Sequence, residues 1–233
     1  MKSGGGYYDD RLEIIEVKLA VPQEWLEMTR DKYWKLMYAA VRIRQILMEQ
    51  LVPEKGIFVM PVDADDLLNC RISQWCTQHP DANGAVSKDG YIWEEGSRIF
   101  RKYQEMHTFC GSCNIIKMYP EELPEEMPFS DELSLDRETA GILNGIYPIR
   151  FDHNTVVKRY ADMGRPFEIL PFRSTVYVRE TGENISGIAQ KEKELKEGPD
   201  TKRFHPVAML RRANVFNMKL ITKRVKREFG IER

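Results

Sequence analysis

The chain has 233 residues, of which 42 % are apolar and 30 % are charged, and its formal net charge is −1. This length and composition fit one large globular domain and argue against a membrane-spanning protein, because no apolar run reaches the roughly 20 residues that cross a bilayer. The near-zero charge gives no bulk attraction to nucleic acid, and the first residues lack the apolar core of a signal peptide, so we expect a cytoplasmic location.

The first part of the chain predicts a strand, a helix and a second strand. Residues 11–19 interleave β-branched residues with charges, which favours a short strand. From Thr29 to Gln50, apolar residues recur at steps of three and four, which is typical of a helix. Residues 57–62 are apolar on both faces, as in a buried strand. Together these elements predict a strand–helix–strand unit with a right-handed crossover and a parallel sheet.

Three carboxylates follow the predicted buried strand within four residues: Asp63, Asp65 and Asp66. Such acids lie where open α/β sheets bind ligands, outside the carboxyl ends of the strands. If the extended geometry persists, Asp63 and Asp65 point the same way and offer two hard oxygen ligands to Mg²⁺ or Mn²⁺. The alternative is a polar turn in which Asp66 caps a short helix over residues 67–78.

The remaining chain alternates extended segments, loops and helices. Residues 85–93 and 167–177 contain strand-like segments, and residues 107–118 hold a Gly-Ser loop followed by the apolar stretch Ile115-Ile116. Helical patterns occur at 138–160 and 206–228, and loops are predicted at 119–136 and 180–202. The last helical pattern belongs to a basic block over residues 202–227. This block is either a solvated helix face or a contact for anionic lipid or a diphosphate carrier.

The cysteines leave two interpretations open. A zinc site would use Cys70, Cys76 or His79, Cys110 and Cys113. It would suit a small zinc module in a nucleic-acid-binding protein. The apolar neighbours Ile72 and Trp75 favour instead a helix that buries these positions, because free cysteine often behaves as a small core residue.

Several motifs occur along the chain in a fixed order. They are Asp31-Lys32-x-x-Lys35, Val-Met-Pro-Val-Asp63-Ala-Asp65-Asp66-Leu, Asp89-Gly-Tyr-Ile-Trp-Glu-Glu-Gly-Ser97, Phe109-Cys110-Gly111-Ser112, Asp152-His153-Asn154, Gly182-Glu183-Asn184-Ile185-Ser186 and the stretch from Ile221 to Gly230. From about residue 11 to the end, this series resembles a bacterial, family 2-like branch of the GT-A glycosyltransferases, which use nucleotide sugars. The resemblance implies an α/β, Rossmann-like fold with a mostly parallel sheet flanked by helices.

The resemblance also implies a metal site. In GT-A enzymes an Asp-x-Asp motif binds a divalent cation that bridges the two phosphates of the sugar donor, and Asp63 and Asp65 match this motif. The cation, Mn²⁺ or Mg²⁺, stabilises the charge that develops on the departing nucleoside diphosphate. His153 is either a further metal or phosphate ligand or a packed histidine.

Donor-binding positions implied by the resemblance are Asp31, Lys32, Lys35, Gly111 and Ser112. Charge capping of a surface helix also explains Asp31 and Lys32, and a tight turn also explains Gly111. An inverting enzyme needs a general base that takes the proton of the acceptor hydroxyl, and Asp152 and Glu183 are the candidates.

The predicted organisation departs from the family at its start. GT-A domains begin with a strand and a proline–asparagine loop that grips the nucleotide base, and neither precedes the acidic motif here. We therefore expect an N-terminally shortened fold, with residues 1–10 as a flexible N-terminus and residues 11–233 as a single catalytic domain that ends in a basic helix.

The resemblance predicts metal-dependent sugar transfer from a nucleoside diphosphate donor to an unknown saccharide or lipid-linked acceptor. It implies no nucleic-acid partner, and the basic C-terminal helix suggests peripheral membrane contact. The alternative is a non-catalytic relative that keeps the fold and serves as a binding or scaffold protein, because a fold alone does not fix a function.

Overall fold

The structure is a computed structural model of the chain. It describes residues 12–18, 22, 25–49, 55–127, 153–179 and 215–231. The predicted flexible segment 1–10, the predicted loop 180–202, and the candidate bases Asp152 and Glu183 lie outside these residues. Within the described ranges, every helix is too short or too polar to cross a bilayer.

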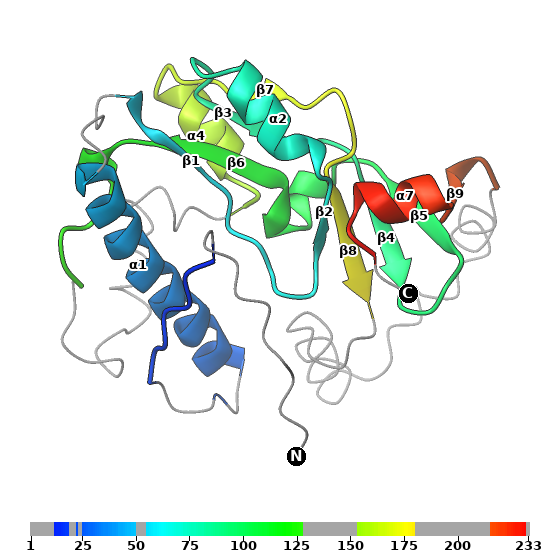
Figure 1. Ribbon diagram of the computed structural model, residues 1–233, viewed down its shortest axis with the longest axis horizontal. Helices are drawn as coiled ribbons and strands as arrows, with labels where there is room; N and C mark the ends of the chain where they lie inside the picture. Colours follow the sequence, from blue (N-terminus) through cyan, green and yellow to red (C-terminus); the bar gives the residue numbers. More distant parts are fainter. Residues whose placement is uncertain are drawn as a thin grey trace.

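Helices and strands alternate irregularly along the chain (Figure 1). The helices are α1 (Trp25–Glu49), α2 (Arg71–Gln78), α4 (Val156–Asp162) and α7 (Lys223–Glu228). The strands are β1 (Ile57–Val59), β2 (Leu67–Leu68), β3 (Gly84–Val86), β4 (Gly90–Glu94), β5 (Ile99–Tyr103), β6 (Asn114–Met118), β7 (Glu168–Ile169), β8 (Thr175–Arg179) and β9 (Met218–Leu220).

The strands form two mixed sheets that lie side by side (Figure 1). The first has the order β1-β6-β3-β7 and the second the order β2-β8-β4-β5-β9. Only the pairs β3–β7 and β4–β8 are parallel among the described strands. The α/β class is therefore confirmed, whereas the prediction of a mostly parallel sheet is wrong. The reason is that β6 returns antiparallel between β1 and β3 instead of following a helical crossover.

Helices α1 and α4 pack on one face of the first sheet. The period of the α1 sequence buries Ala40 and Leu47 against Ile116 and Met118 of β6, and Tyr160 of α4 joins the same cluster. Each large apolar side chain buried in this way contributes about 1.5–3 kcal/mol to stability. This packing fixes the position of α1 relative to β1, which matters for the site below.

Helix α2 packs on the opposite face of the same sheet. Trp75 lies against Ala85 of β3 and Ile115 of β6, with Phe58 of β1 at its edge. The side chains of β1 and β6 therefore alternate between the two faces, and each face is covered by helix. This arrangement explains why residues 57–59 are apolar on both sides.

The second sheet is covered on one face by α7. Phe100 of β5 and Val176 of β8 pack against Val225 and Phe229 of the α7 segment. The ring centroids of Phe100 and Phe229 are 5.8 Å apart at 89°, an edge-to-face contact. Thr222 caps this short helix, because its side chain accepts a hydrogen bond from the Val225 N–H at 3.3 Å.

Three predicted elements differ from the structure. Residues 12–18 form no strand, so the strand–helix–strand unit is wrong. Residues 67–78 split into β2 and α2 instead of one helix. The part of the basic segment that the structure describes contains β9 and the six-residue α7, so one helix over 206–228 is wrong. Pairing with a neighbouring strand overrides the helical pattern at β2 and β9, whereas residues 12–18 pair with no strand among the described residues.

Candidate functional site

The acidic motif lies where the chain passes from one sheet to the other. β1 belongs to the first sheet and β2 to the second, and the segment between them crosses the junction (Figure 1). A turn forms inside this segment, in which the Asp66 N–H donates to the Asp63 carbonyl at 3.0 Å. We call residues 63–66 the acidic turn. β1 ends at Val59 and not at residue 62, and the turn at residues 64–65 breaks the extended geometry that would have aligned Asp63 with Asp65.

Two segments from elsewhere in the chain meet at Asp63. Lys32 of α1 donates from Nζ to Asp63 Oδ1 at 2.5 Å. The Asp63 N–H donates to the Ser112 Oγ at 2.9 Å. Three positions that the sequence marked separately, on a helix, a turn and a loop, thus lie in direct contact.

Asp31 and Lys35, the other two predicted donor-binding positions on α1, pair with each other. Lys35 donates to Asp31 at 2.6 Å, so this pair forms an i, i+4 ion pair along α1. Both belong to the same helix as Lys32, and they pair with each other, whereas Lys32 pairs with Asp63. For Asp31 and Lys35 the geometry matches helix-surface pairing.

The Gly111–Ser112 turn is held at the junction by hydrogen bonds. It forms a single turn of 3₁₀ helix over Gly111–Cys113, and Ser112 is fully buried. The Thr175 Oγ1 of β8 donates to the Ser112 carbonyl at 2.5 Å, and the Ser87 N–H donates to the Cys113 carbonyl at 2.9 Å. Since these partners come from the second sheet and from the end of β3, the turn ties both sheets to the acidic turn.

His153 lies beside the same turn. A Cβ placed on Gly111 would be 4.0 Å from the His153 Cβ. The Asn114 Nδ2 donates to the His153 carbonyl at 3.3 Å, which fixes the backbone just before α4. The structure therefore brings His153 to the Gly111–Ser112 turn.

Asp66 has a role that sequence reasoning missed. It does not cap α2, which begins at Arg71, so the capping alternative is wrong. Its side chain is 8 % exposed, and its Oδ2 accepts a hydrogen bond from the Cys110 thiol at 3.0 Å. Burial raises the pKa of Asp66, the nearby Ser112 hydroxyl and Cys110 thiol oppose this, and the charges of Asp63 and Asp65 reinforce it.

The donor chemistry of the acidic turn fits a divalent cation. The turn offers carboxylate oxygens, which Mg²⁺ and Mn²⁺ prefer. The Asp66 Oδ1 is buried and has no hydrogen-bond partner of regular geometry among the described residues, so the acidic turn contains an unsatisfied acceptor. No group of three or more His, Cys, Asp or Glu side chains in the described ranges is arranged to hold a metal. Asp63 and Asp65 would therefore need ligands from substrate and water, and Lys32 already contacts one Asp63 oxygen.

The zinc alternative is wrong, and all five of its proposed ligands lie in the described part of the chain. Cys110 and Cys113 are buried in one hydrophobic cluster, whereas Cys76 packs at the edge of another and Cys70 is exposed. No metal-binding group forms among them. A structural zinc site needs four converging ligands, which these residues do not provide. Cys110 and Cys113 are core residues, whereas the expected burial of Cys70 is wrong.

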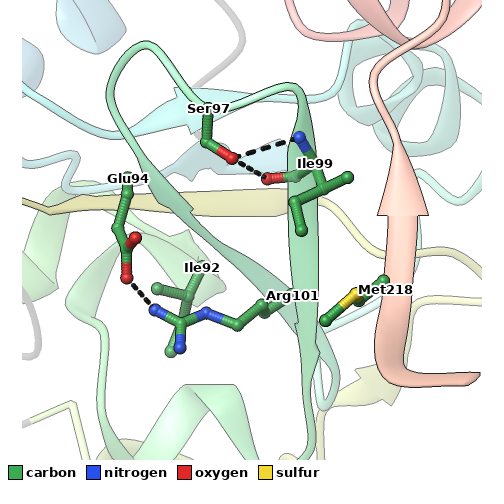
Figure 2. Close-up of a pocket in the computed structure, with 6 residues that line it drawn as sticks. All are labelled: Ile92, Glu94, Ser97, Ile99, Arg101 and Met218. Carbon is green, nitrogen blue, oxygen red and sulfur yellow. Dashed lines mark hydrogen bonds and ion pairs between the residues drawn. The ribbon is translucent and has the colours of Figure 1, made fainter. Parts of the chain in front are cut away.

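A separate pocket of about 180 Å³ lies on the second sheet, at the edge formed by β4, β5 and β9. Figure 2 shows its lining residues, which are Ile92, Glu94, Ser97, Ile99, Arg101 and Met218. Arg101 is ion-paired with Glu94, and the Ser97 side chain bonds to the backbone of Ile99. Its polar groups therefore satisfy one another, and the acidic turn remains the better candidate site.

Comparison of the chain with protein-family models, curated proteins and solved structures found no match.

Proposed function

We propose that this chain is a divalent-metal-dependent glycosyltransferase that moves a sugar from a nucleoside diphosphate donor to an acceptor hydroxyl. The observation that carries the proposal is the convergence of Lys32, Asp63 and Ser112 at the junction of the two sheets. The GT-A resemblance marks these positions in three separate motifs. Lys32 and Ser112 each contact Asp63, which supports a single site for a cation and a diphosphate beside the Gly111–Ser112 turn.

Each residue has a distinct role in this proposal. Asp63 and Asp65 hold the cation, which supplies positive charge to the diphosphate as it leaves. Lys32 moves from Asp63 to a phosphate oxygen when the donor binds, because a phosphate is a stronger partner for an ammonium than an exposed carboxylate. Ser112 keeps the acidic turn in place through the Asp63 N–H.

The acceptor side of the proposal rests on sequence. His153 lies beside Gly111, and the resemblance gives it as a ligand for a phosphate or for the cation. Asp152, the adjacent residue, and Glu183 are the proposed general bases that take the acceptor proton. The acceptor class, a saccharide or a lipid-linked sugar, follows from the resemblance alone.

Calorimetric titration tests the donor site. We expect UDP or GDP to bind the full chain in the presence of Mn²⁺, and binding to weaken at least ten-fold in Asp63→Ala and Asp65→Ala. The matched control is Asp162→Ala, which also removes an exposed carboxylate that pairs with a lysine, here Lys158 on α4. Equal binding by the two site variants and the control would contradict the proposal.

A second candidate is a non-catalytic relative that binds nucleotide sugars or serves as a scaffold. The Lys32–Asp63 ion pair favours it, since a lysine can replace the charge of a metal at a carboxylate. Hydrolysis or transfer of sugar from a panel of nucleotide sugars separates the two candidates. Turnover that depends on Mn²⁺ and on Asp65 would exclude the non-catalytic reading.

A further inference from the structure

One side of the second sheet carries a dense group of cations, which we call the basic edge. It consists of Lys102, Lys219, Lys223, Arg224, Lys226 and Arg227. Five of the six belong to β9 and α7, and Lys102 belongs to the neighbouring strand β5. The rest of the chain is acidic by comparison, because the whole protein has a net charge of −1.

The strand register places these cations on one face. Lys219 is opposite Phe100 in the β5–β9 pair, and opposed residues of an antiparallel pair point to the same face. Phe100 packs against Val225 and Phe229 of the α7 segment. Lys102 follows Phe100 by two residues in the same strand and therefore shares its face. The two lysines thus flank the helix that carries the other four cations.

Acidic residues neutralise little of this charge. Within residues 215–231 the only acid is Glu228, and it is paired with Arg224 at 2.9 Å. Lys102 donates to the Phe216 carbonyl at 3.0 Å, so it is held at the start of β9 without losing its charge. Lys219, Lys223 and Arg227 are exposed. The basic edge therefore presents a local positive field on a nearly neutral protein.

A large apolar side chain accompanies the cations. Phe216, in the 3₁₀ turn Val215–Asn217 just before β9, is 81 % exposed, and Lys102 donates to its carbonyl. β9 is the edge strand of its sheet, and its exposed Leu220, opposite Ile99, points to the other face (Figure 1). Exposed aromatic and aliphatic side chains beside lysines and arginines are typical of surfaces that lie on anionic bilayers, where cations meet headgroups and apolar groups enter the interface.

We propose that the basic edge binds the surface of an anionic lipid bilayer, with Phe216 inserted at the level of the headgroups. Charge complementarity selects the occupant, and the exposed Phe216 favours a bilayer over a purely ionic partner. The inference is independent of sugar transfer, because the cations of the basic edge belong to β5, β9 and α7, whereas the acidic turn contacts α1 and the Gly111–Ser112 turn.

Vesicle co-sedimentation of the full chain tests this proposal. We expect binding to vesicles of phosphatidylcholine with phosphatidylserine, little binding to phosphatidylcholine alone, and a fall in binding as salt is raised. Each cation lost near an anionic surface weakens partitioning about five-fold. The triple variant Lys219→Gln/Lys223→Gln/Arg227→Gln should therefore bind about a hundred-fold more weakly.

The matched control removes three exposed lysines elsewhere: Lys18→Gln/Lys55→Gln/Lys158→Gln. It should bind vesicles as the unaltered chain does, and Phe216→Ser should weaken binding without changing its salt dependence. Circular dichroism confirms that each variant is folded.

Two outcomes would overturn the proposal. One is equal binding to neutral and anionic vesicles, or an equal loss in the control triple. The other is displacement of vesicles by a DNA oligonucleotide together with unchanged vesicle binding by Phe216→Ser. That second pattern would assign the basic edge to a polyanion instead of a bilayer.

Discussion

Lys32 places a positive charge against Asp63, a predicted metal ligand. This contact should have opposite effects on the binding of a bare metal ion and on the binding of a metal–diphosphate complex. The Lys32 ammonium lies 2.5 Å from Asp63 Oδ1, in a place that a divalent cation would also favour. At the same time, a lysine beside a cation site is well placed to bind phosphate. The residue should therefore hinder a bare metal ion and help a metal–diphosphate complex.

Substitution of Lys32 tests these opposite effects. In Lys32→Met we expect Mn²⁺ alone to bind up to about five-fold more tightly, because an exposed ion pair is worth no more than about 1 kcal/mol. UDP in the presence of Mn²⁺ should bind more weakly. Calorimetric titration of each ligand measures both effects, with Lys158→Met as the control. Weaker binding of Mn²⁺ alone in Lys32→Met would contradict the assignment.

Asp66 is the second residue with a distinctive consequence, because its carboxyl is buried. A carboxyl whose pKa is raised in the folded state holds its proton more tightly there than in the unfolded chain. Stability is then lost as the pH rises from the ordinary carboxyl pKa through the raised one.

We therefore expect Asp66→Asn to stabilise the metal-free protein at neutral pH. The advantage should disappear in acid, below the ordinary carboxyl pKa, where the native carboxyl is also neutral. Urea unfolding at a series of pH values, with a chelator present, measures this. Asp162→Asn, at an exposed carboxylate, is the control. Lower stability of Asp66→Asn at neutral pH would show that the charged form is the native one.

At the scale of elements, the sequence predicted the features that local periodicity determines. The helix of α1 and the strand of β1 were confirmed, because each has a strong pattern of buried positions. The segment 12–18 has a strand-like pattern but no strand partner, and Ile14 is 83 % exposed. A pattern of alternating residues shows that a segment could form a strand, but pairing depends on a partner that local sequence does not encode.

The sequence predicted only part of the candidate site, because only some of its positions depend on local periodicity. Asp63 and Asp65 follow a strong strand signal, so their place at a strand end could be inferred. The contact with Ser112 depends on β6 returning beside β1, and the link to Thr175 depends on the second sheet. These are pairings between residues far apart in the chain. Asp66 was missed because its burial arises from Cys110, 44 positions away.

Helix α7 gives a prediction at this scale, since it has only six residues and depends on its cap and its packing. Thr222→Ala removes the hydrogen bond to the Val225 N–H and should cost about 1 kcal/mol of stability. Thr77→Ala on α2 is the matched control, because that hydroxyl bonds back to the Ser73 carbonyl within the helix. Urea unfolding compares the two, and equal losses would show that the cap contributes nothing special.

At the scale of the whole molecule, the two sheets are joined by buried hydroxyl groups. Ser87 links the end of β3 to Ser174, with a hydrogen bond of 3.0 Å from the Ser174 N–H, and Thr175 links β8 to the Ser112 turn. Gly90, at the start of β4, packs so closely against Met106 that a Cβ at this position would lie 2.7 Å from the Met106 side chain. These contacts couple the sheets, so we expect them to unfold together.

Thr175→Val keeps the shape of the side chain but leaves the buried Ser112 carbonyl without its donor. We expect a loss of about 1–3 kcal/mol, the cost of an unsatisfied buried polar group, and weaker nucleotide binding because the acidic turn loses its support. Thr108→Val, at an exposed site, should change stability by less than about 0.5 kcal/mol. Separate transitions for secondary and tertiary signals would show that the sheets are not coupled.

The four cysteines differ in burial, and this difference makes one of them a selective site for labelling with a dye. Cys110 and Cys113 are sealed in the core, burial raises the pKa of Cys76, and Cys70 is exposed. A maleimide fluorophore should therefore couple first at Cys70, whose N–H donates to the Glu228 carbonyl at the end of α7. The emission wavelength of a polarity-sensitive label at Cys70 would shift when another molecule or surface approaches α7.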